Sequence, residues 1–324
     1  MTIAVLMGGR SAEHEISLMS GGAILTALSK RGFPNIRAVT VSREHQWSAD
    51  GSPATFSQAL EGVDVALLAF HGEWGEDGRA QALMEWLGLP YNGSRPTASA
   101  LAMDKPMSRI LLREHGLSIP QGSTHMRPGD RNAMERLVED IACTHPFPIV
   151  VKPASRGSSV GVTLVRTAHQ LIPALHEAFR YDSRALVEEY LDGIEVSCGV
   201  LEELSGKLMA LPVAQIIPTR DHALFDFHAK YSGETQELVP APLAPDIAQR
   251  VAETALTAHF ALGCRHYSRT DMIIVAGKPI VLELNTLPGL TPESILPKEA
   301  LAAGLSYPAL IERLVGLASR DRIQ

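Results

Sequence analysis

Two short apolar runs near the C-terminus, MIIV and PIVL, are separated only by Ala276-Gly277-Lys278, a pattern that predicts a β-hairpin. Asp271 lies just before the first run and Glu283-Leu284-Asn285 follows the second, so a hairpin would bring the two acids close together. Carboxylate and amide oxygens are ligands that Mg²⁺ prefers, and Mg²⁺ usually takes further ligands from water and nucleotide phosphates. The hairpin therefore predicts a magnesium site and, with it, an ATP-dependent enzyme.

Composition restricts the classes of protein that fit. The 324 residues, 45% of them hydrophobic, can form a sizeable core, and the length favours two or three domains. A net charge of -7 provides no overall basic field, so we expect small-molecule chemistry and no nucleic-acid binding. Cys143, Cys198 and Cys264 are too widely spaced for a disulfide framework or a zinc cluster. Without a basic leader or a long apolar run, the chain is expected to be cytoplasmic, with no membrane contact.

The first part of the chain has the pattern of an α/β domain. Residues 3–7 form an apolar run that ends at Gly8-Gly9-Arg10-Ser11, as expected for a buried strand followed by a glycine turn and a helix. Residues 63–70 form a second such run, and residues 79–87 have a helical pattern. Asp104 has the position of an N-cap for the next helix, so we place the first domain boundary near residue 103.

The rest of the chain is predicted to form two further domains, which gives limits of 1–103, 104–192 and 193–324. Helices and strands alternate in the middle part, whereas the strands of the last third have mostly short connections, which predicts antiparallel pairing there. One of these strands is expected over residues 207–216. The segment 219–236 has little apolar periodicity and is predicted to be a lid or a binding loop.

A glycine- and serine-rich segment, residues 154–161, follows Lys152 and leads into a strand predicted over residues 160–165. Glycine lets the backbone approach a phosphate closely, serine hydroxyls donate hydrogen bonds, and Lys152 supplies a compact charge. The segment lacks the strand-to-helix context of a Walker A motif, and an ordinary hairpin turn is the alternative. Together with the predicted magnesium site, it indicates phosphate binding.

Several charged residues have both a functional and a structural interpretation. Glu188 and Glu195 flank a turn at the predicted domain junction, where they would bind a ribose or an adenine amine, or else be solvated. Lys230-Tyr231 lies in the predicted loop and would close a polar site, or be solvated as well. Glu13-His14-Glu15 follows the first glycine turn, where capping of a helix start is the alternative. His71 is a single histidine with the same ambiguity.

A series of segments, in this order along nearly the whole chain, resembles the D-alanine:D-alanine ligases of the ATP-grasp superfamily. The segments are GGRSAEHEIS, HGEWGEDG, LPYNGS, ASALAMDK, VKPASRGSSVG, FHAKY, RTD and LELNTLPGLTPES. One of them alone would be weak support, but the ordered series is specific. The resemblance implies a three-domain ATP-grasp fold of the α/β (α+β) class, with a Rossmann-like (preATP-grasp) N-terminal domain.

The resemblance also implies a reaction. One D-alanine carboxylate attacks the γ-phosphate of ATP to give D-alanyl phosphate, and the amine of a second D-alanine then displaces phosphate. The product, D-alanyl-D-alanine, supplies peptidoglycan synthesis and thus cell wall biogenesis and cell shape. The implied partners are D-alanine and ATP, with two Mg²⁺ ions for which Mn²⁺ can substitute, and the family forms homodimers.

Matching positions receive roles from the resemblance. Glu15 would hold the ammonium of the first D-alanine and connect through Ser158 to Tyr231. Arg269 and the backbone N–H of Gly289 would stabilise the oxyanion. Amino-acid binding is assigned to His71, Ser294 and Ile295, nucleotide binding to Lys105, Lys152, Glu188, Glu195 and Lys230, and metal binding to Asp271, Glu283 and Asn285.

Alternatives concern the second substrate and the first subsite. Tyrosine at position 231 goes with dipeptide formation in this family, whereas relatives that make D-alanyl-D-lactate differ there, so we favour an amine nucleophile. A non-catalytic nucleotide-binding protein is a further alternative, against which the complete set of predicted metal ligands and Arg269 argues. Trp74, Arg79 and Ala82 depart from the family's usual residues and bear on the shape of the first subsite.

Overall fold

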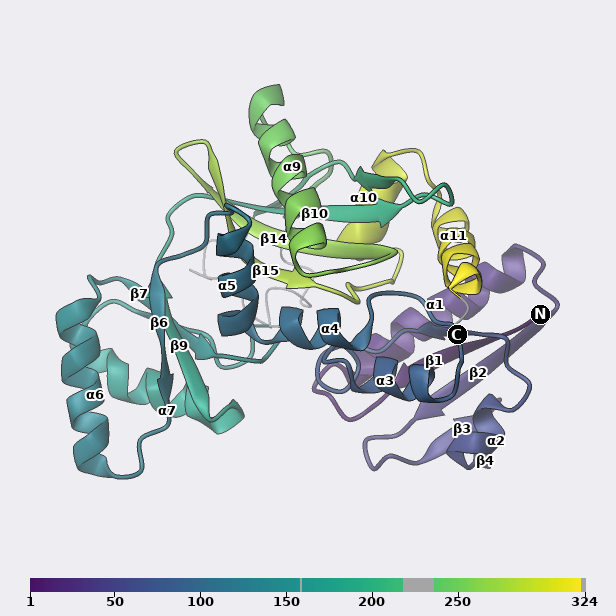
Figure 1. The fold of residues 1–324 in the computed structure, drawn as a ribbon, viewed down its shortest axis with the longest axis horizontal. Helices are drawn as coiled ribbons and strands as arrows, with labels where there is room; N and C mark the ends of the chain where they lie inside the picture. The colour runs from purple at the N-terminus through teal and green to yellow at the C-terminus, as the bar shows by residue number, and fades with distance from the viewer. Residues whose placement is uncertain (158, 218–235, 322–324) are drawn as a thin grey trace.

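The computed structural model describes residues 1–157, 159–217 and 236–321. Its strands form three separate sheets, which lie side by side with helices packed around them (Figure 1). This mixture of sheets and helices confirms the predicted α/β class. Ser158, Lys230 and Tyr231 lie outside the described residues, as does the predicted lid 219–236 apart from Gln236.

The N-terminal sheet has the strand order β4-β3-β2-β1-β5. β1 pairs in parallel with both β2 and β5, which confirms the predicted α/β opening, and β3 and β4 add an antiparallel edge. Residues 3–6 of β1 are fully buried, as expected for a parallel strand with both faces covered. The elements of this part are β1 (Thr2–Gly8), α1 (His14–Lys30), β2 (Asn35–Val41), β3 (Trp47–Ala49), β4 (Ser52–Ala54), α2 (Phe56–Leu60), β5 (Val65–Leu68), α3 (Arg79–Trp86) and α4 (Pro96–Met103).

The second sheet, with the order β6-β9-β7-β8, is antiparallel throughout. Apolar side chains of α6 and α7 form one core with this sheet. β8 is shorter than predicted, because Gly161 adopts a left-handed conformation (φ 72°) and turns the chain before the strand begins. The elements are β6 (Gly122–Met126), α6 (Arg131–Thr144), β7 (Ile149–Pro153), β8 (Thr163–Val165), a 3-10 helix (Ala168–Gln170), α7 (Leu171–Tyr181) and β9 (Arg184–Glu189).

The third sheet, with the order β13-β12-β10-β14-β15, confirms the predicted antiparallel pairing, and β11 also pairs with β10. The single strand predicted over 207–216 is wrong, because Pro212, which has no N–H to donate, separates β11 from β12. α9 covers one face of the sheet, and α10 packs against β10. The elements are β10 (Ile194–Glu202), β11 (Leu208–Ala210), β12 (Ala214–Ile217), β13 (Gln236–Leu238), α9 (Pro245–Ala261), β14 (Tyr267–Val275), β15 (Lys278–Asn285), α10 (Ile295–Ala302) and α11 (Tyr307–Arg320).

Two helices join parts of the chain that are distant in sequence. α5 (Lys105–Glu114) begins at the predicted N-cap, where the Asp104 carboxylate accepts a hydrogen bond from the Met107 N–H at 3.1 Å. Leu112 of α5 belongs to the core of the third sheet. α11 belongs to the core of the first sheet and lies beside α1 (Figure 1). The domain limits at residues 103 and 192 therefore stay predictions, since both helices pack across them.

Within the described part of the chain, no single helix is long and apolar enough to cross a membrane. α10 and α11 reach that length and composition only as a pair, and the pair is bent by 102°. The three cysteines are free, with Cys198 buried and Cys143 exposed.

His259 makes the stability of the third sheet sensitive to acid. It lies buried on α9, with Nδ1 2.8 Å from the Ser268 hydroxyl, and burial lowers its pKa to about 4. An unfolded histidine titrates near 6.5, so below that pH the unfolded state binds a proton that the folded state does not. Between pH 7.5 and pH 5 we expect this group to remove about 2 kcal/mol from the free energy of unfolding.

Urea unfolding of the His259→Gln variant at the two pH values measures this contribution. The variant should lose about 2 kcal/mol less than the parent protein between pH 7.5 and pH 5, whatever its stability at pH 7.5. His176→Gln, at an exposed histidine, is the matched control and should leave the pH dependence unchanged. Equal losses in the parent and the His259 variant would contradict the prediction.

Candidate functional site

The predicted hairpin is confirmed. β14 and β15 pair in antiparallel register with Asp271 opposite Glu283 and Arg269 opposite Asn285. The turn between the strands consists of Ala276 and Gly277, both with positive φ (49° and 78°), which matches the right-handed twist of the strands. The register shifts by a bulge after Asp271, and bulges can re-aim a side chain beside a site.

Asp271 is the centre of a hydrogen-bonded group on the hairpin. Arg269 donates to both of its oxygens, from Nε to Oδ1 at 2.9 Å and from a terminal nitrogen to Oδ2 at 2.8 Å. The Ser197 hydroxyl donates to Oδ1 at 2.8 Å, and the Asn285 amide lies 3.1 Å from Oδ2. Burial alone would lower the pKa of Arg269, but Asp271 raises it, so the guanidinium stays charged.

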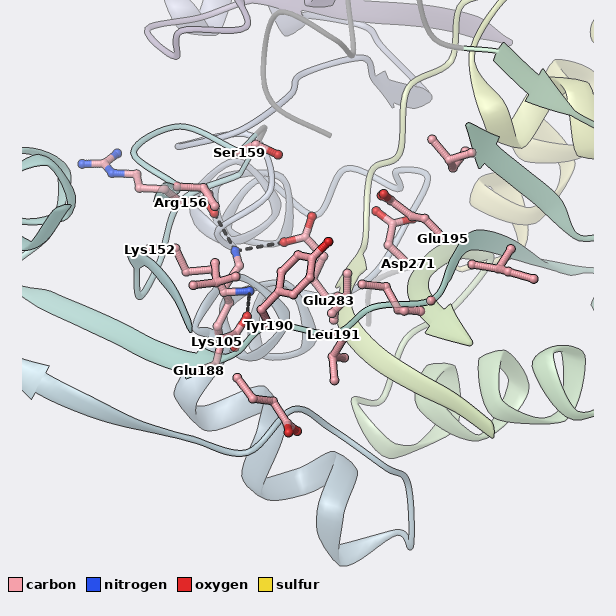
Figure 2. A pocket seen from close by; sticks show the side chains of 18 of the residues that line it. Lys105, Lys152, Arg156, Ser159, Glu188, Tyr190, Leu191, Glu195, Asp271 and Glu283 are labelled. Carbon is pink, nitrogen blue, oxygen red and sulfur yellow. Dashed lines mark hydrogen bonds and ion pairs between the residues drawn. The ribbon is translucent and has the colours of Figure 1, made fainter. Parts of the chain in front are cut away.

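Lys105 connects the hairpin to the glycine-serine segment. Its ammonium lies 3.0 Å from Oε2 of Glu283 and donates to the carbonyl of Arg156 at 2.5 Å (Figure 2). The side chain is buried, and the backbone N–H donates to Ala154 at 3.0 Å. A predicted phosphate-binding lysine and a predicted metal ligand are therefore direct neighbours.

Lys152 and Glu188 form the core of a second ionic group. They lie on the neighbouring strands β7 and β9, and Nζ of Lys152 is 2.6 Å from Oε1 of Glu188. Arg109, from α5, forms an ion pair with the other oxygen of Glu188, and all three side chains are buried. Burial lowers the pKa of Lys152, whereas Lys152 and Arg109 hold the pKa of Glu188 below its usual value despite the opposing effect of burial. Sequence reasoning missed Arg109, which belongs to none of the segments that carry the resemblance.

Five residues of these groups, Lys105, Lys152, Glu188, Asp271 and Glu283, line one cavity of about 340 Å³ between the second and the third sheet (Figure 2). Its lining includes the cations Lys105 and Lys152 and the carboxylates Asp271 and Glu283, of which Lys105 and Glu283 are paired with each other. The remaining lining is largely apolar and includes Val150, Tyr190, Leu191, Ile216 and Leu282, with Glu195 beside Asp271. A cavity with an apolar part and a cationic part has the character of a nucleotide site.

His71 lies outside this cavity, in a buried cluster at the edge of the first sheet. Its Nε2 is 2.9 Å from the Ser20 hydroxyl, and its Nδ1 is 3.2 Å from the carbonyl oxygen of Leu287. Burial disfavours the charged ring, but Glu76, 3.7 Å from Nδ1, and the charge of Glu13 raise the pKa of His71. The cluster thus links the N-terminal sheet to the segment that follows β15.

The structure separates the two glutamates that flank His14. Glu15 is exposed and pairs with Arg43 at 3.5 Å, so it does not reach the His71 cluster. The Glu13 carboxylate instead lies against Gly72 and close to Gly157. A Cβ built on Gly72 would be 2.5 Å from Oε2 of Glu13, and a Cβ built on Gly157 would be 3.8 Å from the same atom. Glu13 is the N-cap residue before α1, whereas Glu15 lies in the first turn of the helix, so the two side chains leave the chain in different directions.

Gly289 and Ser294 lie together after the hairpin. A Cβ at Gly289 would be 2.8 Å from the Ser294 hydroxyl, so the close approach requires glycine. The Ser294 hydroxyl is 2.8 Å from that of Thr291 and accepts from the Thr291 N–H at 3.2 Å. Ser294 is the N-cap of α10, and Ile295 follows as its first, buried residue.

The residues that depart from the family's usual types have separate surroundings. Trp74 packs edge-on against Phe70 and Trp47, while Arg79 and Ala82 are exposed on α3. Among the described residues, no group of three or more His, Cys, Asp or Glu side chains could hold a metal ion by itself. The predicted metal ligands therefore form a sparse set that needs further oxygens from a ligand.

Comparison with known proteins gives one consistent result. A family model described as the D-ala D-ala ligase N-terminus matches residues 2–59 and 42–94. A second model, described as the D-ala D-ala ligase C-terminus, matches residues 111–316. A D-alanine–D-alanine ligase of Syntrophobacter fumaroxidans is 40% identical over 322 residues, which cover 99% of this chain and 98% of that protein.

Solved structures give the same family. The VanG D-Ala:D-Ser ligase from Enterococcus faecalis has a TM-score of 0.85 and 30% identity, covering 98% of this chain and 99% of that chain. A D-alanine–D-alanine ligase from Bacillus anthracis complexed with ATP has a TM-score of 0.76 and 32% identity, covering 99% and 98%.

Proposed function

Because the chain belongs to the D-alanine–D-alanine ligase family, we propose that the cavity between its second and third sheets binds ATP, with its phosphates beside the hairpin acids. The chain has the ATP-grasp fold and joins two D-alanines, at the expense of ATP, into the dipeptide used in peptidoglycan synthesis. The observation that carries the site assignment is the cavity itself, which two buried lysines and the hairpin carboxylates Asp271 and Glu283 line together.

The nucleotide would be held by both parts of the cavity. Lys105 and Lys152 bind its phosphates, joined by Lys230, which lies outside the described residues. Tyr190 and Leu191, with their apolar neighbours, contact the adenine, and Glu195 is placed for the ribose hydroxyls. Glu188 lines the same cavity, and its two oxygens are paired with Arg109 and Lys152. We therefore assign Glu188 to the positioning of Lys152, in addition to the binding of the adenine amine.

The residues present fit a hard cation bound together with the nucleotide. Asp271, Glu283 and Asn285 supply carboxylate and amide oxygens on one face of the hairpin, and the phosphates complete the set. We propose two Mg²⁺ ions, replaceable by Mn²⁺, which neutralise phosphate charge when bound. Bound cations would neutralise the carboxylates of Glu283 and Asp271, which now form ion pairs with Lys105 and Arg269 respectively.

Glu283→Gln tests this assignment. Replacing one anionic ligand should raise the Mg²⁺ concentration that gives half-maximal rate by about tenfold or more. The measurement is ATP turnover over a titration of Mg²⁺, with Glu293→Gln, at an exposed acid, as the control. A Mg²⁺ requirement equal to that of the parent protein would remove Glu283 from the metal site.

The reaction follows from the order of these groups. The carboxylate of the first D-alanine attacks the γ-phosphate to form D-alanyl phosphate and ADP, and the amine of the second attacks its carbonyl carbon. Arg269 and the Gly289 N–H stabilise the oxyanion of the tetrahedral intermediate, which expels phosphate. Ser294 and Ile295 hold the carboxylate of the second D-alanine.

For the first D-alanine we assign Glu13, not Glu15, to the ammonium group, with His71 beside it. Glu13→Gln should raise the KM of the first D-alanine by about 10-fold to 100-fold, because a charge-assisted hydrogen bond contributes about 1.5–3 kcal/mol. Glu15→Gln, at a largely exposed side chain, is the matched control and should change that KM little. Initial rates at varied D-alanine distinguish the two, and a larger effect at Glu15 would reverse the assignment.

The identity of the second substrate is tested by product analysis. We expect an amine nucleophile, because tyrosine at position 231 goes with dipeptide formation in this family. Tyr231 itself lies outside the described residues, and one structural neighbour is a D-Ala:D-Ser ligase. The purified protein is given ATP, Mg²⁺ and D-alanine, alone or with equal D-serine or D-lactate, and the products are identified by mass. D-Alanyl-D-alanine should dominate each mixture. A mixed product in excess would assign a different second substrate, and bound but uncleaved ATP would favour a non-catalytic protein.

We also propose a cytoplasmic homodimer. The free cysteines fit a reducing compartment, and ATP is the substrate. Sedimentation velocity at micromolar concentration should give a species of about twice the chain mass of 35.0 kDa. A monomer at the concentrations at which the enzyme turns over would contradict the dimer.

A further inference from the structure

Glu299, on α10, is a fully buried acid that the reaction described above does not use. Its Oε2 accepts a hydrogen bond from the backbone N–H of Gly199 at 2.9 Å. Its Oε1 is buried and has no hydrogen-bond partner within the described ranges. A buried carboxyl group is costly, so its presence at this point of the fold calls for a specific role.

Strand pairing explains why Gly199 needs this acceptor. On one side of β10, Val196 and Ser197 pair with β12, and pairing with β11 starts at Val200. Gly199 lies between these two ladders, and its N–H donates to Glu299 instead of to a strand. A Cβ at residue 199 would be 2.6 Å from the Glu299 oxygen, so only glycine permits the approach.

Gly199 also connects Glu299 to the proposed reaction centre. It is directly opposite Arg269 in the pairing of β10 with β14. α10, which carries Glu299, starts at Ser294 and Ile295, the residues assigned to the second D-alanine. We propose that Glu299 is a positioning residue that fixes the helix of the second D-alanine subsite against the strand pair that carries Arg269. This inference rests on the proposed function of Ser294, Ile295 and Arg269.

The charge state supports the same arrangement. Burial raises the pKa of Glu299 well above its usual value, with Arg269 opposing the shift, so burial favours the neutral form of this acid. A neutral acid accepts the Gly199 hydrogen bond without adding a negative charge next to Arg269 and Asp271. Glutamine has nearly the same shape and the same acceptor and should therefore replace it.

The test compares Glu299→Gln, Glu299→Asp and Glu299→Leu in steady-state kinetics that separate the two D-alanines and ATP. Glu299→Leu removes the acceptor and should lower kcat/KM for the second D-alanine by about 10-fold to 100-fold, the size of effect that a misplacement of about 1 Å produces. Glu299→Asp, one methylene shorter, should lower it as well, and it decides the outcome if the leucine variant fails to fold. Glu299→Gln should stay within about threefold of the parent protein, since the hydrogen bond is kept. The KM values of ATP and of the first D-alanine should not follow these changes.

A purely structural role predicts a different result. Leu314→Ala, on α11, is the matched control, because it destabilises the core of the first sheet and Leu314 belongs to neither α10 nor β10. If the Glu299 variants change only the thermal midpoint, as Leu314→Ala should, the inference is overturned. Ser294→Ala separates this outcome from an error in the proposed subsite. If Ser294→Ala raises the KM of the second D-alanine but the Glu299 variants do not, the role of Glu299 is rejected. If neither Ser294→Ala nor the Glu299 variants change that KM, the proposed subsite itself is rejected.

Discussion

Replacing Arg269 with alanine is expected to lower kcat for dipeptide formation by about a thousandfold, the upper range for loss of an oxyanion-stabilising donor. The side chain donates to both oxygens of Asp271 and is half-buried beside the proposed metal ligands. Alanine would therefore remove the charge that we propose faces the tetrahedral intermediate, and it would leave Asp271 without its cation. Single-turnover and steady-state rates at saturating ATP and D-alanine measure the loss.

A lysine at the same position refines the prediction. Arg269→Lys keeps one positive charge but cannot donate in parallel to both oxygens of Asp271, so its rate should fall between those of the parent and the alanine variant. Arg180→Ala, at an exposed arginine paired with Glu177 on the same helix, is the control and should leave kcat unchanged. Unaltered turnover in Arg269→Ala would exclude Arg269 from the oxyanion site.

Replacing Glu188 with glutamine is expected to lower the free energy of unfolding by about 3–5 kcal/mol, the cost of breaking a buried ion pair by removing one partner. Glutamine keeps the shape of the side chain but leaves the ammonium of Lys152 and the guanidinium of Arg109 facing each other without an anion. The same change should raise the KM of ATP, because Lys152 would lose its fixed position in the cavity. Urea unfolding at pH 7 and ATP-dependent initial rates measure the two effects.

The pH dependence supplies an independent check with a definite sign. Burial favours the neutral acid, yet Lys152 and Arg109 hold the pKa of Glu188 below its usual value. Its stabilising contribution is therefore complete above the unfolded pKa of about 4.3 and is lost as the pH falls through the folded value. Glu188→Gln should remove this part of the acid sensitivity. Glu177→Gln, at a surface pair, should change stability by less than about 1 kcal/mol, and a similar small change at Glu188 would refute the buried network.

Sequence reasoning was most successful where local pattern and local geometry coincide. The hairpin that brings Asp271 and Glu283 together, the α/β opening of the chain and the Asp104 cap are confirmed. It was least successful where a helix or a loop decides the direction of a side chain. Glu15 was assigned to the first subsite through the resemblance, but it lies on the outer side of α1, and Glu13 faces the cluster.

The sequence by itself determined the fold class, the hairpin and the family, because apolar periodicity, turn residues and ordered motifs are properties of short segments. Only the tertiary structure decided that Arg109 reaches Glu188 and that Glu299 reaches Gly199, 100 positions away in the chain. These contacts depend on how α5 and α10 pack against separate sheets. No local pattern encodes that packing, since it results from the burial of apolar faces throughout the chain and from the need to give each buried polar group a partner.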